Sequence, residues 1–292
     1  MKILHFSPVK KENEIVELHL KSLKDLQKEG LNLTYSFFDD NDDFRSSLLL
    51  KKFVGNFDNG ILFTQTDIKL EDKSKNQKER WVIDSYKRIT AIKNFAIKYF
   101  LNNDYDYLFF TDSDLILHPE TLKILLQQNK HFCSEIFWTK FDYTPTYAPN
   151  GWYSKPHGYT KEDLLMFREN GTYKVDFTGA CTLLSRQILL DNVSFKKISN
   201  LDYLGEDKHF CIRASVMDYD IYLNTTYPAF HLYDINLINQ GKEFIRLGYD
   251  LTYLKFWLND EWEKKIDPWL YPAKKTFYMK FLSILKKLMH NK

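Results

Sequence analysis

The sequence has few cysteines, and their arrangement excludes two kinds of structure. Only three occur in 292 residues, at Cys133, Cys181 and Cys211, and no two of them form a Cys-x-x-Cys pair. An odd number of widely separated cysteines is not typical of a disulfide framework or of a structural zinc site. We therefore expect reduced thiols and a cytoplasmic protein.

The sequence also lacks a strong charge of either sign and any long apolar run. Its formal net charge is only +2, so we expect no nucleic-acid partner. No stretch approaches the roughly 20 apolar residues that a membrane-spanning helix needs. The run from Met1 to Lys11 indicates a first β-strand rather than a signal peptide, because it has no long apolar segment and no cleavage-like site.

No internal repeat and no low-complexity linker divides the chain. Its length allows one large α/β domain with additions, or two small domains. Aromatic residues are abundant, with 19 Tyr, 23 Phe and 6 Trp. Such side chains stack on sugars in some proteins, but they more often fill cores, and we favour that interpretation for most of them.

The start of the chain has a strand-helix-strand pattern. Ile3–Phe6 is an apolar strand that Ser7 and Pro8 are expected to end, and residues 14–28 show the apolar spacing of a helix. Leu31–Phe38 is a second strand, followed by acidic residues. This order is typical of a doubly wound sheet, in which ligands bind at the carboxyl ends of the strands.

Further along, Trp81–Leu101 is predicted to be an amphipathic helix and Tyr105–Thr111 a buried central strand, with a helix from Pro119 to about Gln128. Residues 130–175 are rich in aromatics, Pro and Gly and are expected to form a long irregular region. We therefore predict an α/β domain over residues 1–240 and a C-terminal helical extension over 241–292.

One acidic motif is set apart by its context. The sequence contains four Asp-x-Asp triplets, but only Asp112-Ser113-Asp114 follows a buried apolar strand directly and precedes a second apolar step. Two carboxylates at such a place are costly unless a partner neutralises them. Oxygen ligands suit Mg²⁺ or Mn²⁺, which keep several waters and bind substrate phosphates, so we predict a metal site there.

Four blocks in this order resemble the GT-A glycosyltransferases of the family 2 type and their Anp1-like mannosyltransferase relatives. They are the helix segment with Arg88 and Ala91–Asn94, the Asp-x-Asp run at residues 106–122, the strand at 175–181, and the segment Gly205–Ala214. The resemblance covers about residues 3–231, and it implies a nucleotide-sugar half at 1–128 and an acceptor half at 129–240. It implies a Rossmann-like, mostly parallel sheet flanked by helices, and transfer of a sugar from a nucleotide donor.

The resemblance also implies roles for individual residues. Asp112, Asp114 and His231 would hold Mn²⁺ or Mg²⁺, although a half-buried structural histidine is the alternative for His231. Residues at strand ends and on the long helix would contact the donor: Ser7, Pro8, Asp39, Asp40, Arg88, Lys93, Asp112, Ser113 and Gly179.

Catalysis is assigned to an acidic pair. In inverting members of these families the base lies where this chain has Glu206 and Asp207, and we predict Asp207 as base with Glu206 beside the acceptor. The alternative is a pair that only stabilises a helix N-terminus. Stereochemistry stays open, because family 2 enzymes invert whereas Anp1-like enzymes retain; in a retaining enzyme Asp207 would position the acceptor.

The expected partners are a UDP- or GDP-sugar and a glycan or lipid-linked acceptor, as in polysaccharide synthesis. The basic amphipathic segment 274–292 is expected either to contact an anionic membrane at its inner face or to dock on protein. Two other functions remain as alternatives. One is a non-catalytic nucleotide-sugar or glycan-binding domain. The other is a haloacid-dehalogenase-like phosphatase, in which Asp112 would be a nucleophile.

Overall fold

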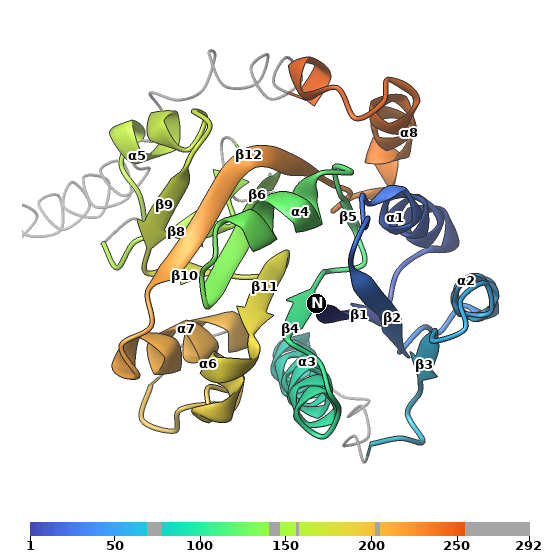
Figure 1. Ribbon diagram of the computed structural model, residues 1–292, viewed down its shortest axis with the longest axis horizontal. Coiled ribbons are helices and arrows are strands. Elements are labelled where there is room, and N and C mark those ends of the chain that lie inside the picture. The colour runs from blue at the N-terminus through green and yellow to red at the C-terminus, as the bar shows by residue number, and fades with distance from the viewer. Residues whose placement is uncertain (69–77, 140–146, 156–157, 202–204, 255–292) are drawn as a thin grey trace, which may run out of the picture.

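The computed structural model describes residues 1–68, 78–139, 147–155, 158–201 and 205–254 (Figure 1). Their centre is one mixed β-sheet with the strand order β3-β2-β1-β4-β11-β6-β12-β5, to which β7 adds beside β6 and β9 beside β12. Strands β8 and β10 form a separate two-stranded sheet. The predicted tail helix at 274–292 and parts of the 130–175 region lie outside the described residues.

The first part of the chain alternates strands and helices. Its elements are β1 (Lys2–Val9), α1 (Asn13–Asp25), β2 (Asn32–Asp39), α2 (Phe44–Val54), β3 (Ile61–Phe63), α3 (Lys78–Leu101), β4 (Tyr107–Phe110), β5 (Leu115–Ile116) and α4 (Thr121–Gln127). The predicted elements that correspond to β1, α1, β2, α3, β4 and α4 are confirmed, whereas α2 and β3 lie in a segment for which no element was predicted.

The second part of the chain contains shorter elements. They are β6 (Phe132–Thr139), β7 (Ala148–Pro149), β8 (Gly151–Trp152), α5 (Lys161–Met166), β9 (Thr172–Val175), β10 (Phe177–Thr178), β11 (Thr182–Ser185), α6 (Arg186–Leu190), α7 (Glu206–Val216), β12 (Ile221–His231), η1 (Ile235–Leu237) and α8 (Ile238–Arg246).

Most long strands of the sheet run in one direction. β2, β1 and β4 are parallel neighbours, as are β2 and β3, while β11 is antiparallel to both β4 and β6. Because β6 is parallel to β12, the strands β3, β2, β1, β4, β6 and β12 all point the same way. The predicted α/β architecture, a mostly parallel sheet flanked by helices, is confirmed.

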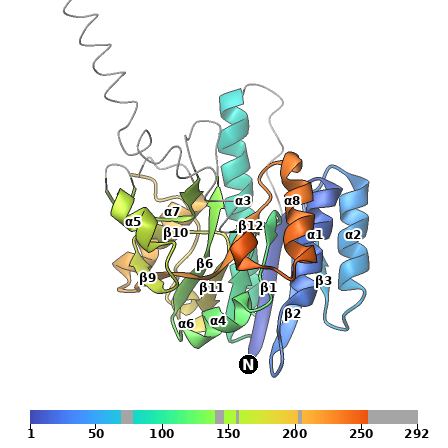
Figure 2. The same ribbon diagram turned by 90° about the horizontal axis from the view of Figure 1, so that it is seen from above.

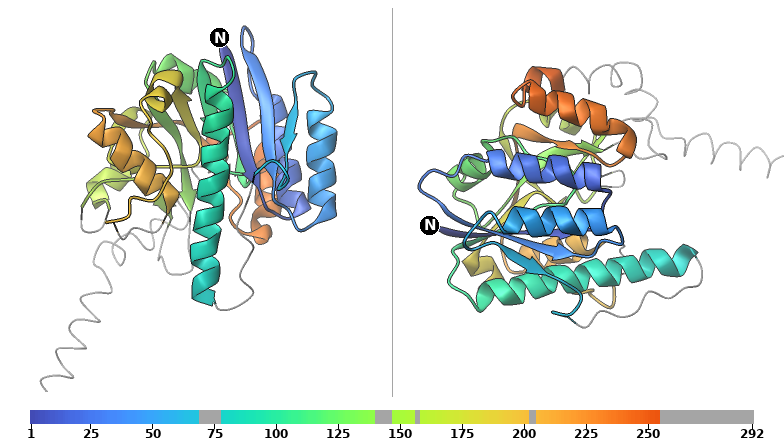
Figure 3. Two further views of the ribbon diagram at one scale, coloured as in Figure 1. Left: turned by 90° about the horizontal axis from the view of Figure 1, so that it is seen from below. Right: turned by 90° about the vertical axis from the view of Figure 1, so that its right-hand side faces the viewer.

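Helices cover both faces of this sheet. One core joins the sheet to α1, α2 and α4 and contains Val16, Leu50 and Leu122. The other joins the opposite face to α3, α6 and α7 through residues such as Ala96 and Phe210. Figure 3 shows α1 and α2 on one side of the strands and α3 on the other, and Figure 2 shows the length of α3 beside the sheet.

The first strand is longer than predicted. β1 continues through Ser7 and Pro8 to Val9, still paired with β2 as far as Asp39. β4, on its other side, pairs only with Ile3–Phe6. Proline has no N–H to donate, which is tolerated where one neighbouring strand has already ended. Pro8 therefore does not break the strand.

The region 130–175 is less irregular than predicted. Phe132–Thr139 forms β6, a strand buried along its whole length in the middle of the sheet. Its polar residues Ser134 and Glu135 hid this strand from a search for apolar runs, but Ser134 bonds Thr182 on β11 and Glu135 accepts from the Tyr227 N–H. Later, residues Ile221–His231 form one long strand, β12, with a register shift between Asn224 and Ala229.

The predicted boundary at residue 240 falls inside α8. This helix packs on the domain, because Gly241 lies close to Ile116, Leu232 and Leu18. Residues up to Leu254, which is buried, thus continue the same core. Within the described ranges, no helix is long and apolar enough to cross a membrane.

Candidate functional site

The Asp-x-Asp motif lies in the short connection between β4 and β5. The Asp114 carbonyl accepts a hydrogen bond from the Leu232 N–H at 2.7 Å, and His231 pairs with Leu115 across β12 and β5. These backbone contacts bring the end of β12 beside the motif. His231 and Asp114, which are 117 positions apart in the sequence, become neighbours as the resemblance implied.

Asp114 and His231 face each other without a direct hydrogen bond. The Asp114 Oδ1 atom is buried and has no hydrogen-bond partner among the described residues, and it lies 3.4 Å from the His231 Nε2. The Nδ1 of the same ring lies 2.7 Å from the Thr139 hydroxyl. With the ring proton on Nε2 the ring faces Asp114 as a donor; with the proton on Nδ1 two acceptor atoms face each other, and a cation between them would remove their repulsion.

This pair fits a divalent metal. Neighbouring ligand atoms of an octahedral ion, with bonds of about 2.1 Å, lie roughly 3 Å apart, close to the observed separation. The described residues contain no group of three or more His, Cys, Asp or Glu side chains able to hold a metal. Two protein ligands nevertheless suit Mg²⁺ or Mn²⁺, since such ions take remaining ligands from water and substrate phosphates.

The other oxygen of Asp114 binds a lysine. The Lys11 Nζ lies 2.8 Å from Asp114 Oδ2. Burial opposes ionisation of Asp114, but His231 and Lys11 outweigh it and hold the pKa of the carboxyl below its usual range. Burial likewise opposes the charge of Lys11, yet Asp114 raises the pKa of the ammonium.

A second charged cluster lies around α7. The Lys93 ammonium, on α3, donates to Glu206 Oε1 at 2.6 Å and to Asp207 Oδ1 at 2.9 Å, and it lies over the Phe195 ring. Its side chain is only 4% exposed, and burial disfavours its charge, but Asp207 and Glu206 raise the pKa of Lys93 well above its ordinary value. Lys93 thus binds the two carboxylates predicted to be catalytic.

Asp207 has the properties of a base near neutral pH. Burial raises its pKa to about 7, although Lys93 acts in the opposite direction. Its side chain is 29% exposed. Among the described residues no donor is hydrogen-bonded to Oδ2, which lies over Gly179. A small cavity of about 10 Å³ between Lys93, Gly179 and Asp207 is large enough for roughly one water molecule.

Asp112 lies within the electrostatic reach of both clusters. Burial raises its pKa, Lys93 lowers it, and Asp114 and Glu206 raise it further. His231 also acts on this carboxyl. Asp112 therefore interacts with members of both the Asp114–His231 pair and the Lys93–Glu206–Asp207 cluster, and the neighbouring Ser113 is buried.

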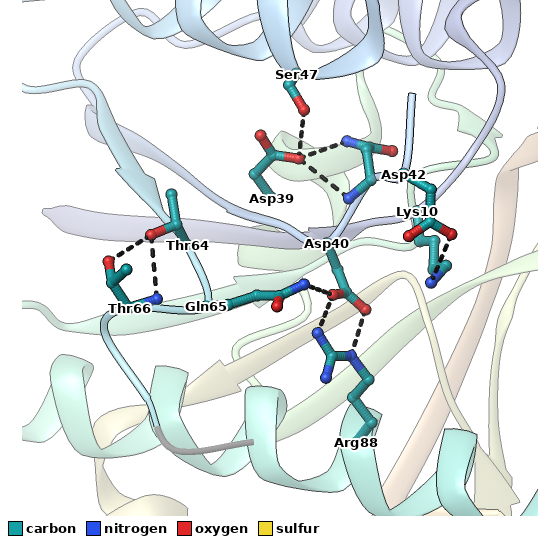
Figure 4. A network of polar contacts seen from close by, with 10 residues as sticks. Lys10, Asp39, Asp40, Asp42, Ser47, Thr64, Gln65, Thr66 and Arg88 are labelled. Carbon is teal, nitrogen blue, oxygen red and sulfur yellow. Dashed lines mark hydrogen bonds and ion pairs between the residues drawn. The ribbon is translucent and has the colours of Figure 1, made fainter. Parts of the chain in front are cut away.

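A third group of contacts forms beyond the end of β2 (Figure 4). The Arg88 Nε, on α3, donates to Asp40 Oδ2 at 2.7 Å, its Nη2 reaches Oδ1, and Gln65 Nε2 donates to Oδ1 at 3.0 Å. Asp39 instead accepts from Ser47 on α2 at 3.0 Å. Arg88 and Asp40 thus come together as a pair, and Asp39 points away from them.

The other residues predicted to contact the donor lie outside the Arg88–Asp40 group. The Ser7 hydroxyl is fully buried within β1 and has no partner among the described residues, and Pro8 is half-buried beside it. Gly179 gives room to Asp207. Lys93 is engaged with Glu206 and Asp207, so its place is the acceptor half of the site.

Two residues of the site were not predicted from the sequence. Lys11 lies in the charged run after β1, where nothing distinguishes it from Lys10. Thr139 is the last residue of β6, a strand that was itself missed. The only signal for Lys11 in the sequence was its position just beyond the carboxyl end of a strand, where ligands bind, and Lys10 shares that position.

Gly179 permits the position of the Asp207 carboxylate. A Cβ at residue 179 would lie 2.2 Å from Asp207 Oδ2 and 2.5 Å from its Cγ, so Gly179→Ala must displace this side chain. We expect a large loss of sugar transfer with nucleotide binding retained, and a loss of about 1–3 kcal/mol in the free energy of unfolding. Transfer assays and urea unfolding check this.

Gly55→Ala is the matched control, because its Cβ would lie 3.3 Å from the Lys51 carbonyl at the end of α2, away from the site. Unchanged transfer by Gly179→Ala would mean that Asp207 can move without consequence, and this would contradict its role.

No protein-family model and no curated protein sequence matches the chain. Solved structures of glycosyltransferases do. The mannosyltransferase PcManGT of Pyrobaculum calidifontis, in complex with GDP-Man and Mn²⁺, is 12% identical with a TM-score of 0.49, over 80% of this chain and 57% of that chain.

S. aureus TarS 1-349 in complex with UDP-GlcNAc is 17% identical with a TM-score of 0.45, over 79% of this chain and 58% of that chain. S. aureus TarS is 14% identical with a TM-score of 0.47, over 85% and 39%. The chain thus spans less than two thirds of each of these proteins. The likeness is one of fold, and the roles of residues in this chain rest on its own geometry.

Proposed function

We propose that the protein is a metal-dependent glycosyltransferase that moves a sugar from a nucleotide-sugar donor to a hydroxyl acceptor, with inversion. One observation carries the proposal: Asp112 interacts electrostatically both with a metal-compatible pair, Asp114 Oδ1 and His231 Nε2 at 3.4 Å, and with the base-compatible carboxylate of Asp207. Sugar transfer needs both functions at one site, because one bond to the sugar breaks while another forms.

The donor end contains Asp114, His231 and the Arg88–Asp40 pair. Asp114 and His231 would hold Mn²⁺ or Mg²⁺, and a bound metal supplies positive charge that stabilises the departing nucleoside diphosphate. Thr139 orients the His231 ring through its Nδ1. Arg88 and Asp40 lie where the nucleoside is expected, beyond the carboxyl end of β2.

At the acceptor end, Asp207 takes the proton of the attacking hydroxyl. The acceptor oxygen forms a bond to the anomeric carbon, the bond from that carbon to the diphosphate oxygen breaks, and the proton passes to the carboxylate. A base with a pKa of about 7 is well matched to neutral pH. Lys93 holds Oδ1 of Asp207 and so fixes its orientation.

The donor is a UDP- or GDP-sugar, and the acceptor is a glycan or a lipid-linked sugar. We place the reaction in the cytoplasm, at the inner face of the membrane if residues 274–292 bind there. The test is a panel of UDP- and GDP-sugars with Mn²⁺, Mg²⁺ or EDTA, measuring donor hydrolysis and thermal shift. We expect one donor to be turned over only when metal is present.

The same panel tests Asp114→Asn. The amide is a weaker metal ligand than the carboxylate, so we expect metal-dependent donor binding to fall at least about tenfold while the fold is kept. Asp42→Asn is the control, since it removes an exposed carboxylate from a neighbouring loop.

The outcomes of the panel separate the alternatives. Donor binding without any turnover would favour a binding domain. Hydrolysis of an added phosphate monoester, with no cleavage of any nucleotide sugar, would favour a phosphatase. Metal-dependent donor binding that is equal in wild type and Asp114→Asn would refute the metal assignment.

A further inference from the structure

The loop after β1 holds Lys11 firmly through its backbone. The Lys11 N–H donates to Asn41 Oδ1 at 3.1 Å, and its carbonyl accepts from the Ser46 hydroxyl at 2.8 Å. These partners lie after β2 and on α2. The main chain is therefore fixed next to the metal-compatible pair, and the side chain alone is left to reorient.

Lys11 and a metal would compete for one carboxylate. Lys11 lies on Oδ2 of Asp114, while Oδ1 has no hydrogen-bond partner among the described residues and faces His231. A divalent ion on Oδ1 would lie close to the Lys11 ammonium, and the two positive charges repel each other. Asp114 cannot bind both at full strength.

The exposure of the two side chains indicates which partner moves. Lys11 is 30% exposed, whereas Asp114 is 11% exposed. The Leu232 N–H bond to the backbone carbonyl fixes the Asp114 main chain, and its carboxylate is on a short side chain, whereas the four-carbon lysine stem is flexible. The neighbouring Lys10 is paired with Asp42, and it points to a different carboxylate.

We infer that Lys11 is an exchangeable counter-ion: it neutralises Asp114 before metal binds, and it transfers to the diphosphate of a nucleoside diphosphate when metal takes its place. The inference rests on the proposed function. It adds a diphosphate-binding residue and makes metal and nucleotide binding mutually dependent. The metal releases Lys11 for the diphosphate, and the diphosphate draws Lys11 away from the metal site. By thermodynamic linkage, the metal raises the affinity for nucleotide by the same factor as the nucleotide raises the affinity for metal.

The experiment measures Mn²⁺ binding, not activity. Free Mn²⁺ is titrated by electron paramagnetic resonance with and without UDP or GDP, for wild type and Lys11→Met. In wild type we expect weak binding of Mn²⁺ alone and binding at least about tenfold tighter with the nucleotide. In Lys11→Met, Mn²⁺ alone binds more tightly, nucleotide binds more weakly, and the coupling falls.

Two further variants keep the result interpretable. Lys10→Met removes a charge from the same loop and should behave as wild type, and Lys11→Arg should restore most of the coupling. If Lys11→Met has the same Mn²⁺ and nucleotide affinities as Lys10→Met, the inference about Lys11 is wrong and the proposed function is not affected. A wild-type protein that binds neither Mn²⁺ nor nucleotide would overturn the proposed function and this inference with it.

Discussion

Asp207→Asn is expected to lose transfer by about 10²- to 10⁴-fold while binding the donor as wild type does, because the amide cannot accept the acceptor's proton. The substitution keeps the size of the side chain and its contact with Gly179. Donor affinity by calorimetry and transfer rate by product analysis, on the same preparation, separate the two effects.

Asp220→Asn is a suitable control, since it removes an exposed carboxylate that forms a surface ion pair with Lys174. Nuclear magnetic resonance of the product gives the anomeric configuration. Full transfer by Asp207→Asn, with retained configuration, would mean that Asp207 positions the acceptor and is not the base.

Lys93→Met is expected to have the largest effect on stability. It leaves the buried Glu206 and the partly exposed Asp207 without their cation, and breaking a buried pair in this way costs about 3–5 kcal/mol. The cost is greatest at alkaline pH. As the pH falls Asp207, whose pKa burial raises to about 7, takes up a proton and the repulsion is relieved. Urea unfolding at pH 8 and pH 5 measures this difference.

The same variant changes the pH profile of any remaining activity. Lys93 lowers the pKa of Asp207, so its removal raises that pKa above about 7 and shifts the acid limb of the profile to higher pH. Lys98→Met, an exposed lysine on the same helix, serves as control. A Lys93→Met protein as stable as this control, with an unshifted profile, would contradict the assignment.

The Asp-x-Asp motif and the acidic pair could be predicted because each depends on local order. Asp112–Asp114 follow a run of apolar residues, and Glu206 and Asp207 open a helix, so both positions can be inferred from neighbours in the sequence. Strands β1, β2 and β4 and helices α1, α3 and α4 could be predicted for the same reason, whereas α2 and β3 were missed.

The contacts of Arg88 and Lys93 could not be predicted. A helix turns by about 100° per residue, so side chains five positions apart point roughly 140° away from each other. The sequence assigned both to the donor, but the structure places Arg88 on Asp40 and Lys93 on the acidic pair. Which carboxylate meets which face of α3 depends on tertiary packing alone.

Lys11, Thr139 and β6 illustrate a second limit. β6 carries buried polar residues whose partners, such as Thr182, lie on strands distant in the sequence. A polar residue lowers the apolar character of a candidate strand, although in the folded sheet that residue has a hydrogen-bond partner. The ion pair of Lys11 with Asp114 likewise requires β1 and β4 to be neighbours.

One helix carries both Arg88 and Lys93, at a separation of about 7.5 Å along its axis. Arg88 holds the carboxylate at the nucleoside end, and Lys93 holds the carboxylate that receives the proton. Because both side chains belong to one helix, any displacement of α3 along its axis would change both contacts together. On the proposed function, tightening around the nucleoside would therefore be linked mechanically to the proton affinity of Asp207.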